Sequence, residues 1–204
     1  MKEFKLYDKE ESKDIIKNNQ YKEILLEILQ REDVATEIEE NIDELLLIIP
    51  EINNMIGFEH RHPHHHLDVW QHTLEVIRNL NSPDIELIMA GLLHDIGKPF
   101  SYQEKDSIRH FKNHPKVSSQ ISKDILTRLN YDEEFIKRVA YLVRKHDTPI
   151  DVENLDNTYE MTQKLLKLQY ADAKAHHPDK VGKRIRYLDK IREDLEKKYG
   201  EYDR

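Results

Sequence analysis

Five polar residues of this 204-residue chain lie on or beside the apolar faces of expected helices: His72, His94, Asp95, His146 and Asp172. One histidine on such a face is usually a core residue with a satisfied hydrogen bond. A buried carboxylate, however, must be paired or must coordinate a metal. Imidazole and carboxylate together are ligands that divalent transition metals favour. We therefore expect side chains from four helices to converge on a cation in the core.

His94 and Asp95 form a dipeptide at the end of the most apolar expected helix, 84–96. Neighbouring residues point about 100° apart on a helix, so they do not normally share one ion. In the terminal turn, with the ion just beyond the end of the face, both side chains can reach it. Gly97 and Lys98 follow, and the lysine brings a cation suited to a phosphate oxygen. This order predicts a metal ion beside an anion-binding lysine.

Apolar periodicity and proline positions define the elements that must place these residues. The expected helices cover roughly 20–31, 36–49, 67–80, 84–96, 115–130, 132–147, 159–177 and 179–198. Thr36 and Glu39 suggest a capping box at the start of the second helix, and Asp132 suggests a cap for a later one. Residues 98–114 read as a loop. We expect an all-α fold of eight or nine helices, with one domain and an N-terminal arm.

The composition excludes several classes of protein. The chain has no cysteine, which rules out disulfides, cysteine-ligated zinc, iron–sulfur clusters and thiolate nucleophiles. Its net charge of −8, with 35% charged residues of both signs, lacks the basic excess of a nucleic-acid-binding domain. The longest aliphatic run, Leu45 to Ile49, is too short to cross a bilayer, and the first residues lack the apolar stretch of a signal peptide. We expect a soluble, cytoplasmic protein.

The order His72, His94-Asp95, Asp172 resembles the HD-domain metal-dependent phosphohydrolases. Five ordered blocks look like the HD domain of bacterial tRNA nucleotidyltransferases, over roughly residues 40–178: Asp68–Leu74, Leu92–Pro99, His110–His114, Leu142–Asp147 and Ala171–His176. Nothing in the chain resembles the nucleotidyltransferase head, so CCA addition is not expected. The resemblance implies an all-α HD-domain helical bundle at 41–178 with a metal site in its core. A helical arm at 1–40 would precede it, and an amphipathic helix at 179–204 would pack on it.

The resemblance also implies roles, position by position. The implied metal ligands are His72, His94, Asp95, His114, His146 and Asp172. His114 and His146 match the pair that holds a second metal in binuclear members, with Asp95 as the bridge. Lys98 matches a phosphate-contacting position and is, with Asp95, an implied catalytic residue. The cofactor is one or two divalent ions, of Mn, Fe, Ni, Co, Mg or Zn.

Substrate contacts are suggested at two further histidines. His110 is close to His114 along the chain, and His65 belongs to the histidine-rich segment 60–66. His65 is a candidate to meet the substrate or an additional ion. The alternative for this segment is that most of its histidines are exposed in a loop.

The chemistry expected of this set is phosphoester hydrolysis. A divalent metal lowers the pKa of a bound water towards about 7, which provides a nucleophile at neutral pH. The metal and Lys98 would offset negative charge on the phosphoryl oxygens. We expect a phosphatase or 2′,3′-cyclic phosphodiesterase that cleaves a phosphomonoester or phosphodiester, of a nucleotide or a nucleic-acid end, with a metal-activated water.

Two other classes of function stay open. The first is a metal-containing, nucleotide-binding sensor module without turnover, although a complete ligand set argues against it. The second is an RNA-associated protein, because basic residues gather at Lys180, Lys183, Arg184, Arg186 and Lys190. Acidic residues dilute this run, so a solvated helix is favoured over a nucleic-acid surface. The sequence does not determine the oligomeric state.

Overall fold

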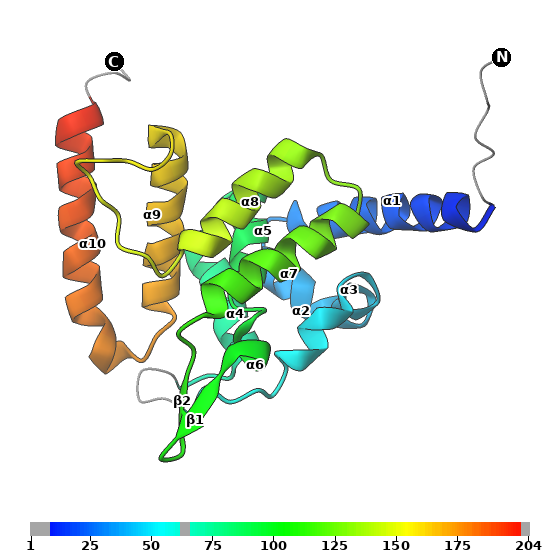
Figure 1. The fold of residues 1–204 in the computed structure, drawn as a ribbon, viewed down its shortest axis with the longest axis horizontal. Coiled ribbons are helices and arrows are strands. Elements are labelled where there is room, and N and C mark those ends of the chain that lie inside the picture. The colour runs from blue at the N-terminus through cyan, green and yellow to red at the C-terminus, as the bar shows by residue number, and fades with distance from the viewer. Residues whose placement is uncertain (1–8, 62–65, 201–204) are drawn as a thin grey trace.

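The computed structural model describes residues 9–61 and 66–200, with side chains from residue 17 onward. In these ranges the chain forms ten α-helices, one 3₁₀ helix and one two-stranded antiparallel sheet (Figure 1). The elements are α1 (Lys9–Leu29), α2 (Val34–Glu40), α3 (Ile42–Ile48), the 3₁₀ helix (Pro50–Asn54), α4 (Val69–Leu80), α5 (Ile85–Leu93), α6 (Lys98–Ser101), β1 (Gln103–Lys105), β2 (Ile108–His110), α7 (His114–Arg128), α8 (Glu133–Lys145), α9 (Tyr159–Lys174) and α10 (Pro178–Tyr199). The all-α prediction is confirmed.

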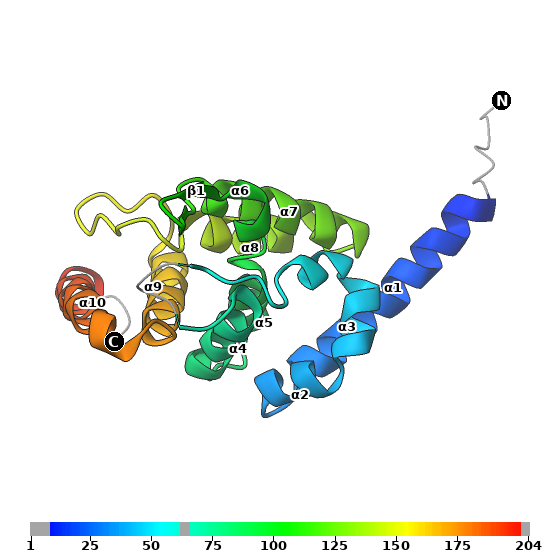
Figure 2. The same cartoon turned by 90° about the horizontal axis from the view of Figure 1, so that it is seen from below.

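Helix α5 occupies the centre of the bundle, because it is apolar nearly all round. Every residue from Leu87 to Leu93 is buried. It contacts α4, α7, α8, α9 and α1, while α10 packs on α9 at one end of the molecule. Figures 1 and 2 show α1 at the opposite end, extending away from the body. None of the described helices combines the length and the apolar character that crossing a bilayer demands.

Aspartate caps set the starts of two helices beside the polar core residues, α4 and α8. Asp132 accepts a hydrogen bond from the Phe135 amide at 2.9 Å and begins α8, as expected. Asp68 begins α4, where it accepts from the Gln71 amide at 2.7 Å and forms a capping box with that glutamine. Each cap satisfies amide groups that the first helical turn leaves without partners.

The prediction of one capped helix over 36–49 is wrong in two respects. Asp33, not Thr36, caps the first helix, and both the amide and the hydroxyl of Thr36 donate to its carboxylate. Glu39 instead forms an ion pair with Arg78 of α4. The helix also breaks at Asn41, whose φ of −109° and ψ of 27° are not helical. The Asn41 side chain donates to the Glu37 carbonyl at 2.8 Å, which closes α2, and its own carbonyl accepts from Leu45 to start α3.

The segment 98–114 is not simply a loop, as the sequence suggested. It contains α6 and a hairpin in which Gln103 pairs with His110 and Lys105 with Ile108. Asp106 and Ser107 turn the hairpin with positive φ values of 53° and 62°, as a type I′ turn requires. Strands this short, the first of them fully exposed, leave no alternating pattern to detect. The hairpin forms one wall of the site described next.

Candidate metal centre

The polar core residues come together at the ends of several helices around α5. His72 projects from α4 and Asp172 from α9, while His114 is the first residue of α7. Helix α5 ends at Leu93, earlier than expected, so His94 and Asp95 lie in the turn that follows it. His146 directly follows α8. All are buried except Asp172, whose side chain is 15% exposed.

The carboxylate of Asp95 lies between two groups of imidazoles. Its Oδ2 is 3.2 Å from Nε2 of His94 and 3.6 Å from Nε2 of His72. Its Oδ1 is 3.3 Å from Nε2 of His114 and 3.8 Å from Nε2 of His146. Each oxygen therefore faces a separate set of nitrogen donors.

We name these sets by their position. The inner group is His72, His94 and Asp172, in which Oδ1 of Asp172 lies 3.0 Å from Nε2 of His72 and 3.9 Å from Nε2 of His94. The outer group is His114 and His146, and both of these residues line an open cleft. Asp95 belongs to both groups, one oxygen to each.

Backbone carbonyls determine which ring nitrogen points into the site. Nδ1 of His94, His114 and His146 lies 2.7, 2.6 and 2.7 Å from the carbonyl oxygen three residues earlier. A carbonyl only accepts, so Nδ1 carries the proton and Nε2 presents a lone pair. The Nε2 atoms of His114 and His146 are only 3.0 Å apart. Two lone pairs this close repel each other unless a cation lies against them.

The pKa values of the groups follow from burial and from the shared aspartate. Burial lowers the pKa of His114 to about 3, against the opposing effect of Asp95, and also lowers those of His72 and His146. Burial would lower the pKa of His94 too, but the charge and close contact of Asp95 and the charge of Asp172 together outweigh it and raise the value. Burial would raise the pKa of Asp95, but His94 and Lys98 hold it well below its usual range. The site thus combines an ionised carboxylate with three imidazoles, those of His72, His114 and His146, whose neutral form is favoured.

The residues fit a divalent metal. Among the described side chains, Nε2 of His94 and both oxygens of Asp95 are buried without a hydrogen-bond partner. Nζ of Lys98 lies 2.7 Å from Oδ2 of Asp95 and forms an ion pair with it, but the two groups are not aligned for a hydrogen bond. A buried polar atom without a hydrogen-bond partner lowers the stability of the fold by about 1–3 kcal/mol, and by more if the atom is charged. Imidazole nitrogen and carboxylate oxygen are donors that divalent transition metals accept, and the groups His72–His94–Asp95 and Asp95–His114–His146 each bring three within reach of one ion.

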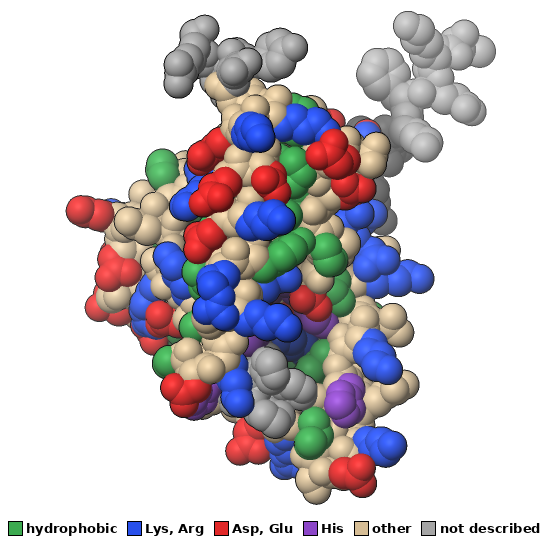
Figure 3. Space-filling model, turned by 90° about the vertical axis from the view of Figure 1, so that its left-hand side faces the viewer, with side chains coloured by type: hydrophobic (Ala, Val, Ile, Leu, Met, Phe, Trp, Pro, Cys, Tyr) green, Lys and Arg blue, Asp and Glu red, His purple; other side chains and the backbone are tan. Residues whose placement is uncertain are grey.

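A cleft of about 250 Å³ opens over the outer group. Lys98 and Asp172 lie towards its floor, Phe111 lines its wall, and Lys112 and Asp147 are exposed at its edge. Arg109 also lines it, but its guanidinium is held by the Glu59 carbonyl at 2.6 Å and the Glu104 carboxylate at 3.3 Å. Figure 3 shows Lys and Arg side chains bordering a recess with histidine inside it. Buried and exposed cations together make the cleft suitable for a phosphate group.

The structure brings together every core residue that the sequence singled out, together with Lys98. His110 is exposed on β2 and lines the cleft. His65 lies outside the described residues.

Two histidines of the site escaped the sequence analysis. His176 contacts the His72 ring, with 5.3 Å between centroids, and its Nδ1 donates to the Asp172 carbonyl at 2.7 Å. Its spacing of four residues from Asp172 was the available signal. His60 is buried against Lys98, and only its membership of the histidine-rich segment pointed to it.

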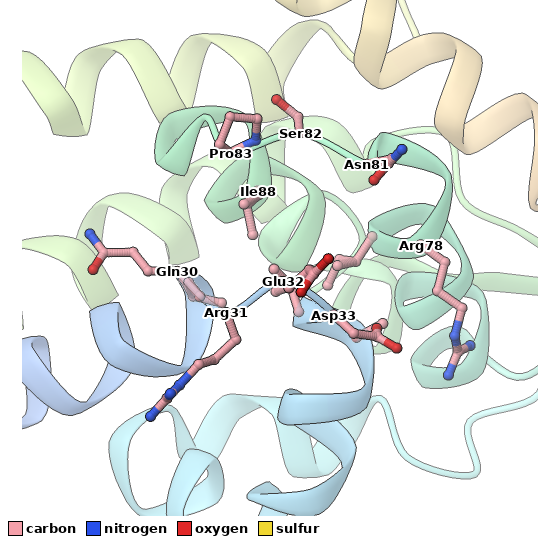
Figure 4. Close-up of a pocket in the computed structure, with 13 residues that line it drawn as sticks. Gln30, Arg31, Glu32, Asp33, Arg78, Asn81, Ser82, Pro83 and Ile88 are labelled. Carbon is pink, nitrogen blue, oxygen red and sulfur yellow. The ribbon is translucent and has the colours of Figure 1, made fainter.

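A larger hollow, of about 550 Å³, lies where the α1–α2 turn meets the α4–α5 turn (Figure 4). No histidine lines it. Its two acidic residues are Glu32 and Asp33, and Asp33 is engaged as the cap of α2. The basic Arg78, at the edge of the hollow, is paired with Glu39. Its lining offers no convergent set of ligands, so size alone does not mark the site.

Comparisons with known proteins give the family and the relatives that the chain resembles. The family described as HD domain matches residues 64–198. The A-adding tRNA nucleotidyltransferase of Deinococcus radiodurans is 34% identical over 123 residues, which cover 54% of this chain and 28% of that protein. The CC-adding tRNA nucleotidyltransferase of Thermus thermophilus is 32% identical over 113 residues, or 52% of this chain and 26% of that protein. The matched segment is thus about a quarter of the length of these relatives.

Proposed function

The chain belongs to the HD domain family, a superfamily of metal-dependent hydrolases, and on that premise we propose that it is a phosphohydrolase. Its substrate is a phosphomonoester or phosphodiester, of a nucleotide or a nucleic-acid end, and the attacking group is a metal-activated water. The observation that supports this most directly is the position of Asp95, with one oxygen towards each of two imidazole groups.

We assign the metal ligands from this arrangement. His72, His94, Asp95 and Asp172 would hold a first divalent ion, and His114 and His146, with Asp95, would hold a second. A bound divalent metal supplies a Lewis acid and lowers the pKa of its water. The mixed nitrogen and oxygen donors suit Mn, Fe, Ni, Co, Mg or Zn, and they do not select one of these.

The remaining residues of the cleft position the substrate and offset its charge. Lys98 is the catalytic cation: it lines the cleft beside Asp95, where it can donate to a phosphoryl oxygen. His110 at the edge of the cleft is a candidate for contact with the rest of the substrate, as is His65 by its place in the chain. The acidic Asp147 shares this edge, so the cleft opening is not uniformly basic.

The relatives support nucleotides or nucleic-acid ends as the substrate class, because their names place their action on tRNA. Nucleotide addition is not proposed for this chain, since the similarity is confined to about a quarter of each relative. The proposed division of the chain remains 1–40 as arm, 41–178 as HD domain and 179–204 as C-terminal helix. The rival function is a metal-containing nucleotide sensor that binds without turnover.

The test is to purify the full chain without a tag and to measure its metal content by elemental analysis. The same sample is then assayed with p-nitrophenyl phosphate, bis-p-nitrophenyl phosphate and 2′,3′-cyclic nucleotides, each with Mn, Ni, Co or Mg. We expect one to two ions per chain and hydrolysis that EDTA abolishes and added metal restores. Bound metal and bound nucleotide without hydrolysis would support the sensor instead. Hydrolysis indifferent to prolonged chelation would contradict the metal mechanism.

A further inference from the structure

Lys98 is an almost fully buried lysine at the floor of the cleft. Its Nζ lies 2.7 Å from Oδ2 of Asp95 and 3.0 Å from Nε2 of His60. A lysine ammonium has three protons and no acceptor, so the nitrogen of His60 accepts one of them. The ammonium retains a donor for a group that enters the cleft. Its position therefore depends on more than the acid: on His60, and on the ring of Phe111, whose centroid lies 5.5 Å from Nζ.

The ring of His60 is oriented to act as that acceptor. Its Nδ1 lies 2.9 Å from the Leu67 carbonyl and must carry the proton, which leaves the lone pair on Nε2. Edge contacts with the rings of His72 and Phe111, at 5.5 and 5.9 Å between centroids, restrict its rotation.

The backbone around His60 is held from both sides. The Val69 amide at the start of α4 donates to the Phe58 carbonyl at 3.1 Å. From the hairpin, Arg109 donates its amide to the Arg61 carbonyl at 3.2 Å and its guanidinium to the Glu59 carbonyl at 2.6 Å. The segment that carries His60 thus connects α4 to the hairpin wall of the cleft.

We propose that His60 is a positioning residue that holds the Lys98 ammonium between Asp95 and the phosphoryl group of the substrate. A lysine side chain is a flexible stem with a point charge, so a single acidic partner does not define where its ammonium lies. Without His60, the Lys98 ammonium is held only by Asp95 and by its contact with the Phe111 ring. It then loses the alignment that its role in hydrolysis requires. The phosphoryl contact rests on the proposed function, whereas the contact between His60 and Lys98 does not.

The first test measures the accessibility of Lys98 and needs no turnover. Brief acetylation of the intact, metal-loaded protein, read by mass spectrometry, compares Lys98 with the exposed Lys112 in the same molecule. We expect Lys98 to be protected in the wild type and in His60→Gln, which keeps a side-chain acceptor. In His60→Ala its labelling should rise towards that of Lys112, with metal content unchanged. His177→Ala, at a histidine outside the cleft, is the matched control. Unchanged protection of Lys98 in His60→Ala would overturn the proposal.

The second test is a double-mutant cycle on hydrolysis. His60→Ala should lower kcat about 10- to 100-fold, the scale expected for a displaced group, with a smaller effect on KM. His60→Gln should recover most of the rate. In a Lys98→Met background, His60→Ala should have little further effect, because it acts through the lysine. Additive losses would show that His60 acts elsewhere and would contradict the proposal. If the wild type hydrolyses no ester, the proposed function fails, and the labelling result alone decides the role of His60.

Discussion

The inner and outer groups of the metal centre share one carboxylate but differ in charge and enclosure. The inner group adds a second ionised carboxylate, Asp172, whose pKa stays well below its usual range: burial would raise it, but His176 and His72 outweigh that effect. The outer group adds only the neutral imidazoles of His114 and His146. Affinity for a hard divalent cation increases with the charge and rigidity of its ligands. On the proposed assignment, an ion in the inner group would be held more tightly than one in the outer group.

Access to solvent separates the imidazoles of the two groups in the same direction. His114 and His146 line the cleft, whereas His72 and His94 are fully buried and do not; of the residues that belong to the inner group only, Asp172 alone lines it. A substrate in the cleft therefore meets the outer imidazoles and Asp172 before the inner imidazoles, and so does a chelator. We infer a division of roles in which the inner group anchors metal and the outer group is the more exchangeable.

The largest effect is expected where the two groups meet. Replacing His94 and Asp95 together by alanine removes the shared carboxylate and one inner imidazole. We expect loss of both ions and a fall in hydrolysis of at least about 10³-fold, since metal and preorganised charge supply most of the stabilisation. Elemental analysis and the ester assay measure these losses, and circular dichroism near that of the wild type serves as the control for folding. Retained activity in this variant would refute the site assignment.

A smaller effect should separate the groups. His114→Ala with His146→Ala should remove about one ion per chain and leave the other bound. Loss of several kcal/mol of charge stabilisation would lower hydrolysis about 10²-fold. Asp172→Asn, which removes a charged ligand from the inner group, should instead weaken the binding of the more tightly held ion. If the two variants have the same metal content and bind their remaining metal with the same affinity, the distinction between inner and outer groups is wrong.

The smallest effect concerns the rate of metal release. Dilute EDTA should remove metal in two phases, a fast one from the outer group and a slow one from the inner group. The His114→Ala, His146→Ala variant should show only the slow phase, because its cleft-lining donors are gone. Stopped-flow measurement with a metal-sensitive dye follows both phases. A single phase in the wild type, at a stoichiometry of two, would show that the ions exchange as one unit.

Much of this centre could be predicted because its signals are local. Apolar periodicity identifies the face of each helix, and a polar residue on that face stands out without knowledge of its neighbours. Asp132 was identified as a cap because an N-cap contacts only amides two or three residues further on. The break at Asn41 was missed since its apolar neighbours continue a helical pattern through it. The cap at Asp33 was missed because Thr36 with Glu39 offered an equally local alternative.

The sequence by itself determined the all-α class, and it predicted a set of donors that could hold a divalent metal and the lysine that follows them in the chain. Only the tertiary structure decided how those donors are shared: which oxygen of Asp95 faces which imidazoles, and which groups lie at the cleft. It also decided that His60 supports Lys98, across 38 residues of chain. The physical reason is that periodicity specifies the direction of a side chain within its own element. The distance between elements depends on how α4, α5, the hairpin and α9 pack together, and no local pattern encodes that packing.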